Sequence, residues 1–128
     1  MYVLIWLALL EIILVLFPAF SFTVNTALHG VLGLGILVLA FYVQRSVRRT
    51  SCPDRIKRIT RTTFALAILQ GVLGLALAAG IELSWGSTFA SVINFLHVVN
   101  SIAIITQASS SATAYDMWEE KEFQAAPS

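Results

Sequence analysis

The two histidines of the chain, His29 and His97, are the side chains whose type and position most directly predict chemistry. Each lies inside a long apolar run and not in a connecting segment. An imidazole in hydrocarbon is costly unless it is paired or ligated, so an ionisable residue within a membrane span is a candidate functional residue. What the two rings can do together depends on the helices that carry them.

The composition is typical of a membrane protein. Hydrophobic residues make up 58% of the 128 residues and charged residues only 12%, against about 45–50% and 25% in soluble domains. A bilayer core about 30 Å thick needs roughly 20 apolar residues in a helix. Four such runs lie at about 2–20, 24–44, 62–83 and 88–110. Short loops join them, which predicts an all-α, integral membrane, antiparallel four-helix bundle.

The charges predict how the bundle is oriented. Seven of the eight basic residues lie between the second and third runs: Arg45, Arg48, Arg49, Arg55, Lys57, Arg58 and Arg61. The positive-inside rule places this loop in the cytoplasm, so both termini of a multi-pass plasma-membrane protein would also be cytoplasmic. Topology explains the basic cluster without a nucleic-acid partner. The bundle should occupy residues 1–118, and residues 119–128 should form a solvated, flexible acidic tail.

The depths of the two histidines can be counted from the cytoplasmic ends of their helices. The second and fourth runs both descend from outside to inside, with His29 16 residues before Arg45 and His97 18 residues before Tyr115. These separations correspond to about 24 and 27 Å, which places both rings in the outer half of the bilayer.

Two imidazoles at one depth on neighbouring parallel helices are what a six-coordinate haem needs as axial ligands. We therefore expect His29 and His97 to ligate the iron of one b-type haem. The same two ligands would serve haem O or haem A. Ordinary packing and, with less support, a separate metal ion are the other interpretations of the histidine pair.

Glycines accompany the candidate ligands. The pentapeptide GVLGL occurs once in the second run and once in the third. Gly33 lies four residues after His29 on the same helix face, with Gly30 adjacent to the histidine. Gly71 and Gly74 give the third run a second smooth stripe, and helix lengths place Gly74 at the depth of Gly33. Such glycines leave room for a flat porphyrin, although small residues also serve helix packing.

Other polar residues in the runs have candidate supporting roles. Asn94 and Ser101 lie three residues before and four residues after His97, so either could accept the second ring N–H and fix the tautomer. Asn100 lies on a different face and is expected to form an interhelical hydrogen bond. Glu11 near the centre of the first run is expected to be protonated or bonded to a neighbour, with a proton relay or a partner contact as the functional alternative.

This arrangement resembles the haem A synthase family. The matching residues are His29 in the second run, Gln70, Leu73 and Gly74 in the third, which fit the family's Q-x-x-L-G, and His97 in the fourth. The resemblance implies a single four-helix half, like the compact archaeal-type members, with haem held by the two histidines. It also implies haem A synthesis as a possible activity.

Two family features are missing from this chain. The family's E-x-x-H-R pattern reads Thr26-Ala27-Leu28-His29-Gly30, so the glutamate implicated in catalysis is absent. The outer-loop cysteine pair is also absent, since the chain's one cysteine, Cys52, lies in the basic loop. These departures leave haem binding as the expectation and leave enzymatic activity open.

The sequence therefore predicts a lipid-embedded haem protein that acts in respiratory electron transfer or in haem A synthase-like chemistry. Its expected partners are other membrane subunits of a respiratory complex, or a second copy of the chain. The alternative is a haem-free accessory subunit that packs against a larger respiratory complex through small residues. A carrier or channel has less support, because the runs show no inverted repeat.

Overall fold

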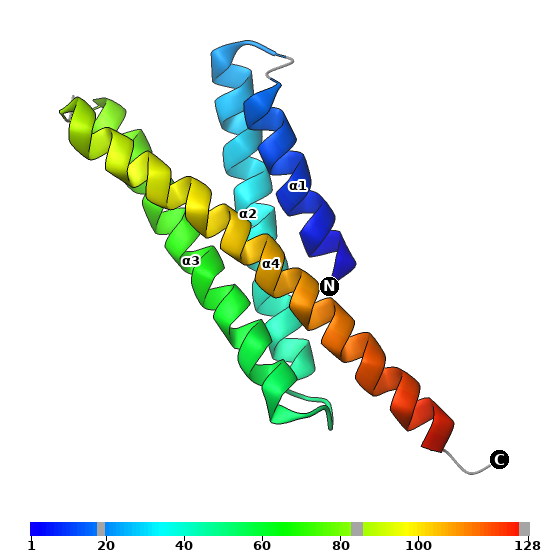
Figure 1. Cartoon of the computed structure of the whole chain (residues 1–128). Coiled ribbons are helices and arrows are strands. Elements are labelled where there is room, and N and C mark those ends of the chain that lie inside the picture. Colours follow the sequence, from blue (N-terminus) through cyan, green and yellow to red (C-terminus); the bar gives the residue numbers. More distant parts are fainter. Residues whose placement is uncertain (18–19, 83–85, 126–128) are drawn as a thin grey trace.

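The computed structural model describes residues 1–17, 20–82 and 86–125. Within these ranges the chain forms four helices and no strand: α1 (Tyr2–Leu16), α2 (Phe22–Val47), α3 (Asp54–Glu82) and α4 (Ser87–Ala125). The helices run antiparallel in chain order (Figure 1). The prediction of an all-α helical bundle is confirmed.

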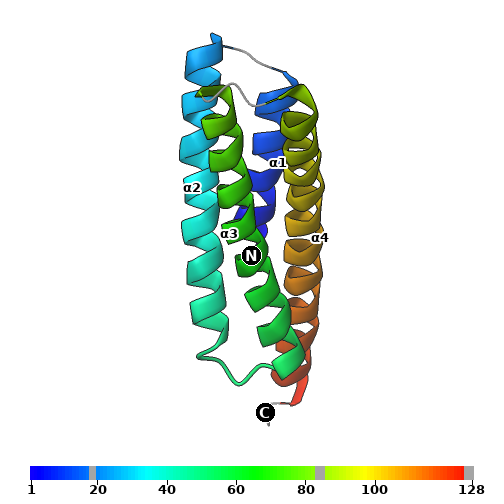
Figure 2. The same cartoon turned by 90° about the vertical axis from the view of Figure 1, so that its left-hand side faces the viewer.

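The four helices form a ring in which consecutive helices are neighbours and α1 closes the ring against α4. Helices α2 and α4 make no direct backbone approach and lie diagonally across the bundle, as do α1 and α3. The expectation that the two histidine-bearing helices are neighbours was therefore wrong. Because α1 and α3 pack between them, side chains of α2 and α4 can meet only in the interior (Figure 2).

Three helices, α2, α3 and α4, are long and apolar enough to cross a membrane. Helix α1 has 15 residues, which corresponds to about 22 Å and falls short of the roughly 30 Å hydrocarbon core. It covers only the part of the bundle away from the α2–α3 loop (Figure 1). Residues 18, 19 and 83 of the expected spans, and 126–128 of the expected tail, lie outside the described residues.

Helix α4 continues well past the expected end of its span at residue 110. It has 39 residues, or about 58 Å, and includes the acidic segment as far as Ala125. Residues 119–125, which were expected to form a solvated tail, are thus helical. No proline or glycine lies between Ser87 and Ala125, and Gln124 Nε2 donates a hydrogen bond to Glu120 Oε1 at 3.3 Å. The side chains of residues 119–124 are exposed, as expected.

The apolar core takes one or more residues from every helix. Its buried members are Leu4, Ala40, Ala67, Ile104 and Ala108. Three of these five are alanines, which let the helices approach closely, as small residues do in membrane bundles. A second cluster at the α2–α3 loop contains Val47, Cys52 and Ile56, packed against residues that include Trp118. These contacts fix the relative depth of the helices and so the depth of the polar residues above them.

Candidate functional site

The rings of His29 and His97 meet in the interior of the bundle. Their centroids are 6.0 Å apart and their planes are inclined by 65°. Both side chains are half-buried. The similar depth counted along α2 and α4 is what allows this meeting, and the diagonal placement of the two helices aims both residues at the bundle interior.

Glu11 is the direct partner of His29. Its carboxylate Oε2 pairs with His29 Nδ1, and the residue is only 8% exposed. The expectation that Glu11 bonds to a neighbour is confirmed. An ionised carboxylate can only accept hydrogen bonds, so an ionised Glu11 accepts one from His29 Nδ1–H, and a neutral His29 then has its lone pair on Nε2. The other carboxylate oxygen, Oε1, is buried without a hydrogen-bond partner among the described residues.

A chain of amides fixes the tautomer of His97. Asn100 Nδ2 donates to Gln70 Oε1 at 2.7 Å and to Leu66 O at 2.9 Å. Because the Gln70 oxygen is thereby an acceptor, its Nε2 is the donor that faces His97 Nε2 at 3.1 Å. His97 Nε2 therefore carries the lone pair, and the ring proton lies on Nδ1. This Nδ1 is buried and has no partner among the described residues.

The second glycine of each GVLGL segment faces this polar cluster, whereas the first does not. A Cβ on Gly33 would lie 3.6 Å from Glu11 Oε1, and one on Gly74 would lie 3.4 Å from His97 Cε1. A Cβ on Gly30 or Gly71 would meet nothing within 4 Å. The two motifs thus leave space beside Glu11 Oε1 and His97 Nδ1, the atoms of this cluster that are buried without a partner among the described residues.

The predicted supporting residues on α4 behave differently from the expectation. Ser101 Oγ donates to Val98 O of its own helix at 2.7 Å, as intrahelical hydroxyls commonly do. Asn94 is exposed and, in the part of the chain described, makes no hydrogen bond to His97. Asn100 forms the interhelical bond expected of it.

Sequence reasoning did not identify the partners of Glu11 and Gln70, which are His29 and His97. Glu11 was the one carboxylate inside the first apolar run, and Gln70 the amide that precedes the second GVLGL. Both were visible as polar residues in apolar surroundings. Spacing along one helix identifies candidates on that helix, but it does not reveal a partner on an adjacent helix.

The two imidazoles are the side chains of the cluster that could serve as ligands of one metal centre, since their ring centroids lie 6.0 Å apart and histidine nitrogens are common haem-iron ligands. The Gln70 amide leaves the lone pair of His97 on Nε2, and a neutral His29 that donates from Nδ1 to Glu11 also has its lone pair on Nε2. On His97 that lone pair accepts from Gln70, a bond that ligation would replace. Within the described ranges, no group of three or more His, Cys, Asp and Glu side chains is arranged to hold a free metal ion.

Comparisons with protein-family models, with curated proteins and with solved structures find no match to this chain.

Proposed function

We propose that this chain is an integral membrane protein that holds one b-type haem between His29 and His97. The observation that carries the proposal is the meeting of the two rings in the bundle interior, with centroids 6.0 Å apart. Two histidines on separate helices, each with its tautomer set by another side chain, are the arrangement expected of paired axial ligands.

The surrounding residues have defined tasks in this proposal. Glu11 orients His29 through Nδ1, as carboxylates do behind metal-bound histidines. Asn100 orients the Gln70 amide, and Gln70 holds His97 in the tautomer that ligation requires. His29 and His97 would both be used in holding the haem, which would keep O₂ from binding to it. A bound haem would supply a one-electron redox couple.

The proposed activity is electron transfer in a respiratory assembly, with haem A synthase-like chemistry as the other haem-based function. The basic α2–α3 loop would face the cytoplasm together with both termini, so the histidines would lie near the outer face. Partners would be other membrane subunits or a second copy of the chain.

The direct test is a reduced-minus-oxidised spectrum of the purified full chain. We expect split α and β bands that His29→Ala and His97→Ala each abolish, while Gln107→Ala, a polar change elsewhere on α4, leaves them intact. Pyridine haemochrome analysis would distinguish haem B from haem O and haem A. A folded, colourless protein that takes up no haem on titration would refute the proposal.

One observation favours the alternative of a haem-free accessory subunit. The Asn100, Gln70 and Leu66 hydrogen bonds join α3 to α4 within the chain itself, and such bonds stabilise membrane bundles without any cofactor. On this alternative, His29→Ala and His97→Ala would change stability, but the protein would have no haem spectrum to lose. The same purified variants therefore separate the two functions.

A further inference from the structure

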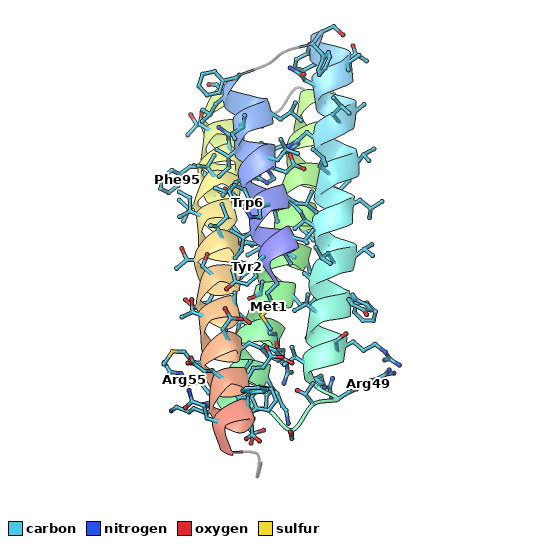
Figure 3. All side chains as sticks on the ribbon, turned by 90° about the vertical axis from the view of Figure 1, so that its right-hand side faces the viewer. Met1, Tyr2, Trp6, Arg49, Arg55 and Phe95 are labelled. Carbon is cyan, nitrogen blue, oxygen red and sulfur yellow. The ribbon has the colours of Figure 1, made fainter. Side chains whose placement is uncertain are left out.

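Six arginines form an exposed group at the end of the bundle where α2 and α3 are joined. They are Arg45, Arg48, Arg49, Arg55, Arg58 and Arg61. Figure 3 shows Arg49 and Arg55 at this end, pointing outward on opposite sides of the molecule. The positive charge is therefore spread around the end of the bundle and not confined to one face.

None of the six arginines has an acidic partner in the described parts of the chain. The ion pair of oppositely charged side chains there is Lys57 with Asp54, and Glu11 is paired with His29 in the bundle interior. The acidic segment of α4 is the obvious internal candidate, but Asp116 accepts a hydrogen bond from Tyr2. Trp118 packs against the cluster at the α2–α3 loop, and beyond it the end of α4 continues away from the loop (Figure 1). Among the described residues, the six arginines thus form no ion pair within the chain.

Helix lengths place these arginines at the level of lipid head groups. The apolar run of α3 begins near residue 62, so the first eight residues of the helix, 54–61, lie beyond it. Eight residues span about 12 Å, which exceeds the roughly 5–8 Å of polar head-group region on one side of a bilayer. Arg55, Arg58 and Arg61 are three residues apart and so form one ridge across this zone. Arg45, Arg48 and Arg49 follow the apolar run of α2 in the same way.

We propose that this arginine group binds the phosphates of anionic phospholipids and gives the protein a preference for them over zwitterionic lipids. A guanidinium matches a phosphate in a bidentate geometry. Basic clusters next to membrane spans gain about 1 kcal/mol per residue from anionic lipid surfaces. Phosphatidylcholine carries a choline cation beside its phosphate and so competes less well. This inference does not depend on haem.

The test uses the full chain reconstituted in phosphatidylcholine bilayers with trace spin-labelled lipid. We expect more motionally restricted phosphatidylglycerol label than phosphatidylcholine label, with the difference shrinking as sodium chloride is raised. Arg49→Gln should lower the relative association of phosphatidylglycerol by up to about fivefold. Arg48→Gln, Arg49→Gln and Arg58→Gln together should nearly abolish the preference.

Lys121→Gln is the matched control, because it removes one exposed positive charge on α4 away from the arginine group. It should leave the preference unchanged, and circular dichroism should show that all variants remain helical. Equal association of the two labels, or equal effects of Arg49→Gln and Lys121→Gln, would overturn the proposal.

Discussion

The backbone of Gly74 on α3 lies directly against the imidazole of His97 on α4. A Cβ at position 74 would lie 3.4 Å from His97 Cε1 and 4.0 Å from Nδ1, and one at position 33 would lie 3.6 Å from Glu11 Oε1. These are van der Waals contacts and not clashes. Alanine can therefore replace either glycine in this structure, while filling the space beside a buried polar atom.

Gly33→Ala and Gly74→Ala should consequently separate helix stability from haem binding. Each should leave the free energy of unfolding unchanged or raise it by up to about 1 kcal/mol, because glycine is a poor helix former. Each should weaken haem binding, measured by haem titration in detergent. Gly35→Ala is the control, since its Cβ would meet nothing within 4 Å. Haem affinity that is the same in all three variants would exclude the glycine faces from the site.

Removing the carboxylate of Glu11 should destabilise the bundle. Glu11→Leu leaves His29 Nδ1 without its partner, at a cost of about 1–3 kcal/mol, whereas Glu11→Gln keeps an acceptor oxygen and should cost less. Denaturant titration in mixed micelles measures the difference. In the double variant Glu11→Leu, His29→Leu both polar groups are gone, so much of the stability should return. If the losses in the free energy of unfolding of the two single variants simply add in the double variant, Glu11 and His29 are not energetically coupled.

The amide chain should control the tautomer of His97. Nitrogen-15 NMR of the haem-free protein should show the proton on Nδ1, and Asn100→Leu should reduce that preference because the Gln70 amide becomes free to turn. Asn94→Leu, on an exposed position of the same helix, should leave the tautomer unchanged. A double-variant cycle on Gln70 and Asn100 should give a coupling of about 0.6–1.7 kcal/mol. A His97 proton on Nε2 in the unmodified protein would contradict this assignment.

Leu4 should contribute strongly to the packing of α1. It is 2% exposed, belongs to the core cluster and borders a cavity of about 10 Å³. Leu4→Ala would enlarge this cavity and should lower the free energy of unfolding by about 2 kcal/mol or more. Val3→Ala, at a position 62% exposed, should change it by less than about 0.5 kcal/mol. Equal effects of the two changes in a denaturant titration would show that α1 does not pack as described.

The α2–α3 loop offers a test of both burial and orientation. Cys52 is 2% exposed and contacts Val47 O at 3.7 Å, so a maleimide should label it slowly until the protein is denatured. Ser51→Cys in a Cys52→Ser background presents an exposed thiol instead and should react quickly in detergent. In intact cells an impermeant maleimide should not reach it until the membrane is opened, as a cytoplasmic loop requires. Labelling of this cysteine in intact cells would contradict the proposed topology, because it would place the α2–α3 loop outside the cell.

The sequence allowed the helical class and the membrane environment to be predicted, since apolar run length and composition depend little on tertiary detail. It also allowed the histidines to be placed at similar depth, because rise along a helix is constant. The ends of the helices were harder to predict from the sequence. Residues 119–125 are polar enough to be solvated, yet none of them terminates α4. A segment can therefore be both exposed to solvent and helical.

The sequence by itself determined which side chains are costly in an apolar interior, namely Glu11, His29, Gln70, His97 and Asn100, because composition and hydropathy are local properties. Only the tertiary structure decided how they pair. The ring of helices puts α2 diagonal to α4, so His29 and His97 meet in the centre and take Glu11 from α1 and Gln70 from α3 as partners. Ser101 bonds its own backbone instead, because a carbonyl one turn back is always within its reach. Which side chains pair across helices depends on the rotation of each helix about its axis and on the angles at which the helices cross. Both are set by the packing of the whole core.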